Sequence, residues 1–131
     1  MKKIKIIIGT LILLIAFLGL TLAANAEMVT VTGKITGFEC FTKGVICPID
    51  KADPMITQEN DFVLVTPTGE HYFMPNIGLG LKAKYALETA TVTGDLNPKY
   101  KTITVSAMSV GGKEVYNKKK ADDWREYMRS R

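Results

Sequence analysis

Val-Thr-Val-Thr-Gly-Lys-Ile, residues 29–35, is the stretch of sequence that decides the fold of this chain. Its apolar residues alternate with threonine and lysine, which is the period-two pattern of a β-strand with one buried face. A similar run, Ala-Thr-Val-Thr-Gly-Asp-Leu, follows at residues 90–96. Each run has an interior glycine, Gly33 or Gly94, where a barrel needs sharp coiling or close approach of two backbones. The two runs predict two strands of a small β-barrel.

The remainder of the region 27–116 supplies three further strands and one short helix. Two of the strands form a hairpin, because Pro67 and Gly69 hold the i+1 and i+3 positions of a type I turn. Asn76 is expected to cap the helix. The expected elements are strands over 61–66, 70–74 and 101–110, a helix over 77–87, and a short extension over 113–116.

Three strands, a helix and two more strands follow one another in the order typical of the OB-fold, a five-stranded Greek-key barrel. The two glycine-containing runs resemble the first and fourth strands of small exported bacterial OB-fold proteins, and the resemblance covers Met28 to Val110. It implies a mainly β fold, an OB-like barrel with one short helix between strands three and four. It also implies a periplasmic binding or stress-associated module, with no catalytic residues to carry over. The cysteine-bearing segment between strands one and two departs from the simplest members, so their ligands do not transfer to this chain.

One family of OB-fold proteins, the periplasmic haem chaperones, binds haem through a histidine in the segment after the barrel. Here the segment 113–131 contains no histidine, which argues against haem binding. No cofactor is implied by the sequence.

The first 26 residues have the features of a secretory signal peptide. Three lysines precede an apolar run from Ile6 to Ala24, which ends in Ala24-Asn-Ala26, with small residues at the −3 and −1 positions of a cleavage site. An uncleaved N-terminal anchor is the alternative, because 19 helical residues span about 28 Å, close to the thickness of a bilayer core. Either interpretation places the domain in the periplasm or outside the cell, in contact with a membrane only if the segment is retained.

Charge argues against nucleic acid as a partner. Without its leader the chain carries 14 basic and 13 acidic residues, a net charge of +1. The region 27–116 is at −2 and the tail 117–131 is at +3. Binding to nucleic acid needs a basic face on the folded body, which this body does not supply.

Cys40 and Cys47 are expected to form an intramolecular disulfide, since the chain is exported and Gly44 and Pro48 supply turn geometry around them. So short a loop contributes roughly 2–3 kcal/mol in the chain-entropy estimate. Two alternatives stay open, a redox-active pair and a metal site. The spacing lacks the Cys-x-x-Cys form of thioredoxin-like sites, and a metal needs ligands beyond two thiolates.

Two weaker candidates concern metals. His71 with Met74 could bind a soft metal, although a histidine facing solvent from a strand is the simpler interpretation. Four carboxylates crowd the loop between strands one and two, where a calcium site is the alternative to a solvated acidic loop. They are Asp50, Asp53, Glu59 and Asp61.

The tail 117–131 is basic and aromatic. Trp124, Tyr127 and Met128 fall on one face of an expected short helix. That face either docks on the barrel or binds a partner or an anionic membrane, and a frayed tail is the third alternative.

These features favour an exported, non-catalytic binding or accessory module of the cell envelope, stabilised by a disulfide. Its partner would be an envelope protein or a small ligand. The alternative is a small periplasmic redox or metal-handling protein that uses Cys40 and Cys47.

Overall fold

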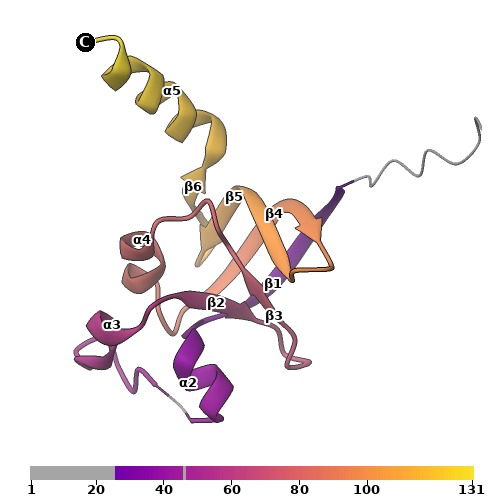
Figure 1. The fold of residues 1–131 in the computed structure, drawn as a ribbon, viewed down its shortest axis with the longest axis vertical. Coiled ribbons are helices and arrows are strands. Elements are labelled where there is room, and N and C mark those ends of the chain that lie inside the picture. Colours follow the sequence, from indigo (N-terminus) through magenta and orange to yellow (C-terminus); the bar gives the residue numbers. More distant parts are fainter. Residues whose placement is uncertain (1–25, 46) are drawn as a thin grey trace, which may run out of the picture.

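The computed structural model describes residues 26–45 and 47–131. Five strands close a small mixed β-barrel (Figure 1), and a sixth strand lies beside the fifth. The strands are β1 (Glu27–Gly37), β2 (Phe62–Val65), β3 (His71–Phe73), β4 (Thr89–Asn97), β5 (Thr102–Val110) and β6 (Lys113–Asn117). Their order is β3-β2-β1-β4-β5-β6, and pairing of β3 with β5 closes the barrel. The predicted OB-like barrel is confirmed, whereas the expected signal segment lies outside the described residues except for Ala26.

The barrel closes because β1 is long enough to pair with two different strands and because β3 pairs with β5. Residues 27–34 of β1 pair with β4, and residues 34–37 pair with β2. Phe73 and Thr102 pair in parallel, and the Phe73 N–H donates to the Lys101 carbonyl at 2.8 Å. Since every strand of the barrel is then paired on both sides, no edge of the five-stranded unit is left open.

Gly33 and Gly94 allow neighbouring backbones to approach closely, as the sequence predicts. A Cβ atom at Gly33 would lie 2.5 Å from the Val65 carbonyl oxygen, and one at Gly94 would overlap the Thr104 carbonyl oxygen. The register between β4 and β5 also shifts between Thr93 and Gly94. The two glycines therefore mark close approaches of neighbouring strands, and Gly94 also adjoins a register shift.

Alternation along the strands separates an apolar interior from a polar outer surface. Val92 of β4 points into the barrel. The threonines on either side of it face outward, and their hydroxyl groups pair with those of threonines in β1, each at 3.0 Å. The pairs are Thr91 with Thr32 and Thr93 with Thr30. The buried core consists of Ile35, Phe62, Leu64, Met74, Ile77, Ala86, Ala90, Val92, Ile103, Val105 and Met108.

The helix between β3 and β4, α4 (Leu79–Lys84), is shorter than the predicted 77–87. Gly78 is its N-cap and Tyr85 its C-cap, and Leu87, with a left-handed φ of 71°, lies outside helical geometry. Asn76 is not the cap that the sequence suggested. Its side chain instead pairs with the backbone of Val105, accepting from the N–H at 2.8 Å and donating to the carbonyl at 2.7 Å.

Two short helices occupy the segment between β1 and β2, where the residues show no helical periodicity. They are α2 (Phe38–Lys43) and α3 (Met55–Gln58). Gly44 ends α2 in the left-handed conformation, and its N–H bonds back to the Phe41 carbonyl at 3.1 Å. The ring of Phe38 in α2 packs at a tilt against that of Phe73 in β3, with centroids 4.8 Å apart, which holds this helix against the barrel.

The C-terminal helix, α5 (Lys118–Arg129), continues from β6 and extends away from the barrel (Figure 1). Asn117 is its N-cap, with the side-chain oxygen accepting the Lys120 N–H at 3.3 Å. The helical tail expected from the sequence is thus present. Within the described part of the chain, no helix is both long enough and apolar enough to cross a membrane.

Candidate functional site

The Cys40–Cys47 disulfide is formed, as the sequence predicts, with the two Cα atoms 5.5 Å apart. Cys40 lies in α2 and is 2% exposed. Cys47 lies in the following loop and is only half-buried. The two cysteine residues therefore differ in their exposure to solvent.

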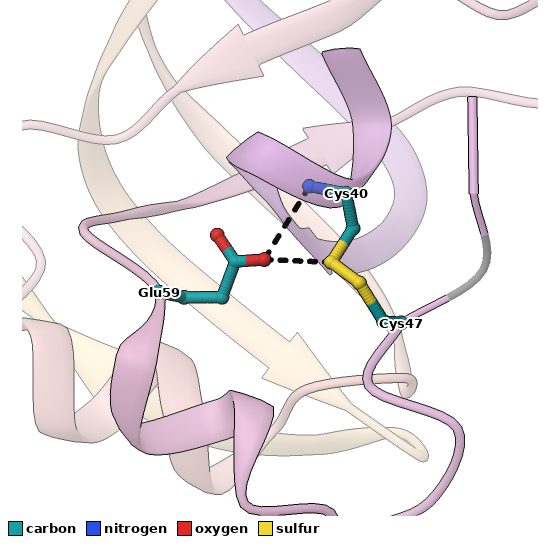
Figure 2. A group of neighbouring side chains, drawn as sticks. All are labelled: Cys40, Cys47 and Glu59. Carbon is teal, nitrogen blue, oxygen red and sulfur yellow. Dashed lines mark hydrogen bonds between the residues drawn. A yellow bond between two sulfur atoms is a disulfide. The ribbon is translucent and has the colours of Figure 1, made fainter. Parts of the chain in front are cut away.

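A buried carboxylate, that of Glu59, lies against this disulfide (Figure 2). The Glu59 side chain reaches α2 from the end of α3 and the residue is 4% exposed. Its Oε2 accepts the backbone N–H of Glu39 at 3.1 Å, and its Oε1 accepts that of Cys40 at 3.4 Å. Oε1 also lies 2.7 Å from Cys40 Sγ. One carboxylate thus caps a helix and contacts a sulfur atom.

The capping role follows from the local sequence. Gly37 precedes α2 and has no side chain with which to satisfy the free N–H groups of the first turn, so Glu59 supplies the acceptors. Gly37 is also required by the same contact, since a Cβ at that position would overlap the Glu59 carboxylate. Sequence reasoning placed Glu59 in an acidic loop and missed this role, because the contact joins residues about 20 positions apart.

The acidic loop does not assemble into a calcium site, because each carboxylate has a partner of its own. Asp53 accepts the N–H groups of Ile49 at 2.8 Å and Met55 at 2.9 Å, and these two hydrogen bonds lower its pKa. Asp50 accepts the Ala52 N–H at 2.8 Å. Asp61 pairs with the buried ammonium of Lys82, and Glu59 is turned toward α2.

Among the described residues, one group has the donor set of a metal site, namely Cys40, Cys47 and Glu59, whose ligand atoms lie within 4.8 Å of one another. Thiolates bind metals and disulfide sulfurs do not, so the group could hold a metal only after reduction. The arrangement in its oxidised form is a disulfide with a carboxylate against its inner sulfur.

His71 is only partly exposed, whereas the sequence suggested a histidine that faces solvent. It is half-buried, and its ring lies 4.8 Å from that of Phe41 and 5.9 Å from that of Phe73. Burial lowers the pKa of His71, and the nearby charge of Lys101 lowers it further. Met74 is fully buried in the core, so the structure does not bring these two candidates together as a metal site.

The aromatic face of α5 is open to solvent. Trp124 is 62% exposed, which contradicts the expected docking of its indole on the barrel, and Tyr127 and Met128 are exposed with it. The Trp124 and Tyr127 rings lie 5.6 Å apart, and the Arg131 guanidinium lies 4.9 Å from the Tyr127 ring centre. We call these four residues, Trp124, Tyr127, Met128 and Arg131, the aromatic face.

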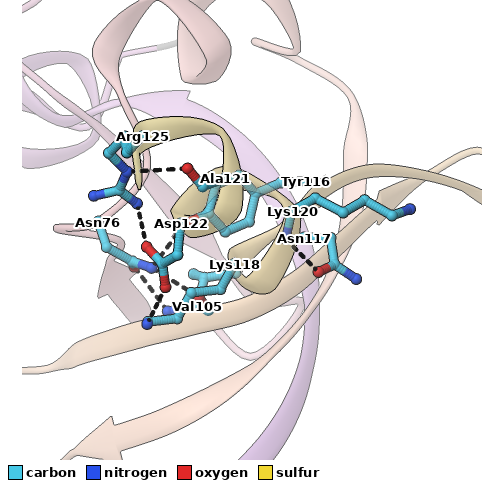
Figure 3. Close-up of polar contacts among 9 residues, drawn as sticks. All are labelled: Asn76, Val105, Tyr116, Asn117, Lys118, Lys120, Ala121, Asp122 and Arg125. Atoms are coloured by element: carbon cyan, nitrogen blue, oxygen red, sulfur yellow. Dashed lines mark hydrogen bonds and ion pairs between the residues drawn. The ribbon is translucent and has the colours of Figure 1, made fainter. Parts of the chain in front are cut away.

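Polar contacts hold the first turns of α5 in place, and Figure 3 shows those around Asp122. Asp122 accepts from Lys118 at 2.7 Å and from Arg125 at 2.8 Å, and the bond from Lys118 lowers the pKa of Asp122. Lys120 pairs with Glu114 of β6 at 2.7 Å. The base of the helix is thereby joined to the barrel.

Comparison with protein-family models, curated proteins and solved structures gives no match. Function is therefore argued from these two features, the disulfide with its carboxylate and the aromatic face.

Proposed function

We propose that this protein is an exported binding module of the cell envelope whose α5 helix engages the acidic surface of a partner protein. The observation that carries the proposal is the exposed aromatic face. A 12-residue helix is marginal on its own. This one is joined to the barrel at its base, while its largest side chain, Trp124, remains in water.

The composition of the face suits a protein partner. Tryptophan, tyrosine and arginine are the residues most often found at the centres of protein interfaces, where a buried ring fills a pocket. Trp124 and Tyr127 supply the rings, and their mutual contact orders them before binding. A membrane-surface helix would need a broader apolar face than the two rings and one methionine present here.

Charge supports an acidic partner surface. The lysines at the base of α5 are already paired with Asp122, Asp123 and Glu114. Arg129 and Arg131, at the far end, form no ion pair with any residue that the structure describes. Arg131 belongs to the aromatic face and Arg129 lies near the same end of the helix, so both guanidinium groups are available to carboxylates on the partner.

Export is supported by the N-terminal sequence and by the disulfide. Disulfides form and persist in oxidising compartments. The Cys40–Cys47 bond is consistent with such a location. The signal-like segment 1–26 and the resemblance to small exported OB-fold proteins favour the same compartment.

The test compares Trp124→Ala with Tyr100→Ala, a matched control whose ring is equally exposed, at 62%, in the turn between β4 and β5. Tagged proteins are cross-linked in the native envelope fraction, and the captured proteins are quantified by mass spectrometry. We expect one partner to be captured by the wild-type protein and by Tyr100→Ala. It should be lost with Trp124→Ala and with the double variant Arg129→Glu/Arg131→Glu, while the thermal midpoint is unchanged.

Equal capture by all four proteins would overturn the proposal. Binding of the purified protein to phosphatidylglycerol vesicles, lost in Trp124→Ala, would also overturn it and would identify the face as membrane-directed.

A further inference from the structure

We propose that Cys40–Cys47 is an exchangeable disulfide that oxidises protein dithiols, with Cys47 as the sulfur attacked and Glu59 as the positioning residue that favours the reduced state. This activity goes beyond the binding function proposed for α5 and uses a different part of the molecule. It rests on three observations: the unequal exposure of the two cysteine residues, the contact of Glu59 with Cys40 Sγ, and the fixed position of α2.

Unequal exposure determines which sulfur an incoming thiolate reaches. Cys40 is 2% exposed beneath α2, whereas Cys47 is half-buried in the loop. Ile49, two residues beyond Cys47, is 78% exposed and offers an apolar contact beside it. A thiolate that attacks Cys47 Sγ displaces Cys40 Sγ, which leaves toward the interior of the protein.

Glu59 distinguishes the oxidised and reduced states of Cys40. In the disulfide, Cys40 Sγ carries no hydrogen, so the 2.7 Å contact with Glu59 Oε1 brings together two atoms that both present lone pairs. After reduction, the thiol S–H donates to the same oxygen. A hydrogen bond to a charged acceptor is thereby gained only in the dithiol state, which makes the disulfide a stronger oxidant.

The position of the carboxylate is fixed by contacts that do not depend on the redox state. Its two oxygens are held by the backbone N–H groups of Glu39 and Cys40, and α2 is held on β3 by Phe38. The carboxylate therefore remains beside the sulfur when the disulfide opens.

The reaction is a two-step exchange with a protein dithiol. One thiolate of that protein attacks Cys47 Sγ, the Cys40–Cys47 bond breaks, and its electron pair goes to Cys40 Sγ, which takes a proton from water. The second thiolate then attacks the mixed disulfide, and Cys47 leaves as a thiolate that is also protonated. Two electrons and two protons pass from the dithiol to Cys40 and Cys47, and the partner acquires one disulfide.

The first experiment measures the equilibrium constant of the disulfide with glutathione in the wild-type protein, in Glu59→Leu and in Asp53→Asn. Glu59→Leu removes the cap of α2 in both redox states, so the cap loss cancels in this equilibrium. We expect a shift of about tenfold toward the disulfide form, the effect of one hydrogen bond. Asp53→Asn loosens the same loop without touching the sulfur, and its constant should equal that of the wild type.

The second experiment locates the attacked sulfur. The lone thiols of Cys40→Ser and Cys47→Ser are allowed to react with oxidised glutathione, and the folded state of each variant is checked by circular dichroism. We expect the Cys47 thiol of Cys40→Ser to react on the order of 100-fold faster than the Cys40 thiol of Cys47→Ser, because of its exposure. The wild-type protein should also oxidise a synthetic two-cysteine peptide.

A disulfide that stays closed under millimolar reduced glutathione would overturn the proposal and leave a structural crosslink. Faster reaction at Cys40 than at Cys47, or an unchanged constant in Glu59→Leu, would overturn it as well. Binding of one zinc ion by the reduced protein, without oxidation of the peptide, would replace it with a metal site formed by Cys40, Cys47 and Glu59.

Discussion

Replacing Gly37 by alanine should destabilise the protein through Glu59 alone. Gly37 has φ −58° and ψ 134°, a conformation open to any residue, so its backbone poses no obstacle to a side chain. The nearest atoms to the added Cβ all belong to the Glu59 side chain, which the methyl group would displace. The structure therefore allows one contact to be tested by changing the residue that has no side chain.

The expected cost follows from what Glu59 does. Its displacement leaves the backbone N–H groups of Glu39 and Cys40 without their acceptor near the barrel. Loss of a helix cap costs about 0.5–2 kcal/mol, and each buried unsatisfied donor costs about 1–3 kcal/mol. Because Glu39 is partly solvated, we expect about 2–3 kcal/mol for Gly37→Ala. In a domain of this size that lowers the thermal midpoint by on the order of 10 °C.

A double-mutant cycle provides the decisive measurement. In a Glu59→Ala background the obstacle to Cβ is gone, so Gly37→Ala should be neutral or should stabilise by about 0.4–1 kcal/mol through the unfolded state. Urea unfolding of the oxidised proteins, followed by circular dichroism, gives the four free energies. If Gly37→Ala costs the same with and without Glu59, the proposed contact does not hold α2 and the reasoning is refuted.

Three further predictions concern the barrel. Asp61→Asn should lower the free energy of unfolding in urea by about 3 kcal/mol or more, because it leaves the buried ammonium of Lys82 without its partner. Lys82→Met should lower it much less, because the buried charge is removed. Equal losses for the two variants would contradict the assignment of this ion pair. Gly94→Val should reduce the yield of folded protein, measured by gel filtration, because any Cβ meets the Thr104 carbonyl. The folded-state pKa of His71 is lowered by burial, so the unfolded chain binds more protons and stability should fall as pH drops below about 6.5; His71→Phe should flatten that slope in urea titrations at each pH.

The strands of the barrel could be predicted because their signal is local. The alternation in 29–35 and 90–96 predicts that the valines and the interior glycines lie on one face of each strand. In the structure these residues form β1 and β4, and the valines pack in or against the core. The glycines were informative for a physical reason. Only a residue without Cβ permits the carbonyls of Val65 and Thr104 to lie so close, and that requirement is already visible in the order of residues.

The carboxylate beside the disulfide could not be predicted, because it depends on the path of the chain between β1 and β2. Glu59 was one of four acidic residues in a segment without periodicity, and nothing near it in sequence identifies Cys40 as its neighbour. The available signal was indirect: a helix beginning after Gly37 lacks a side-chain cap and needs an acceptor from elsewhere.

For the tail, the sequence predicts the helix but not what the helix packs against. The spacing of Trp124, Tyr127 and Met128 predicts that they share a helix face, but spacing does not say what lies opposite that face. Whether the indole packs on the barrel depends on the direction in which β6 ends. Here α5 leads away from the barrel, and its base is held by Lys120 and Glu114.

The two proposed functions occupy additions to the barrel and not the barrel itself. α2 with its disulfide lies at one end of the molecule and α5 extends from the other (Figure 1). A partner bound to the aromatic face would therefore leave Cys47 accessible, and thiol exchange at Cys47 needs no contact with α5. It follows that Trp124→Ala should abolish partner capture without changing the equilibrium with glutathione, while Glu59→Leu should do the reverse. If instead one variant altered both measurements, the barrel would have to couple its two ends, and the rigid closed sheet gives no reason to expect such coupling.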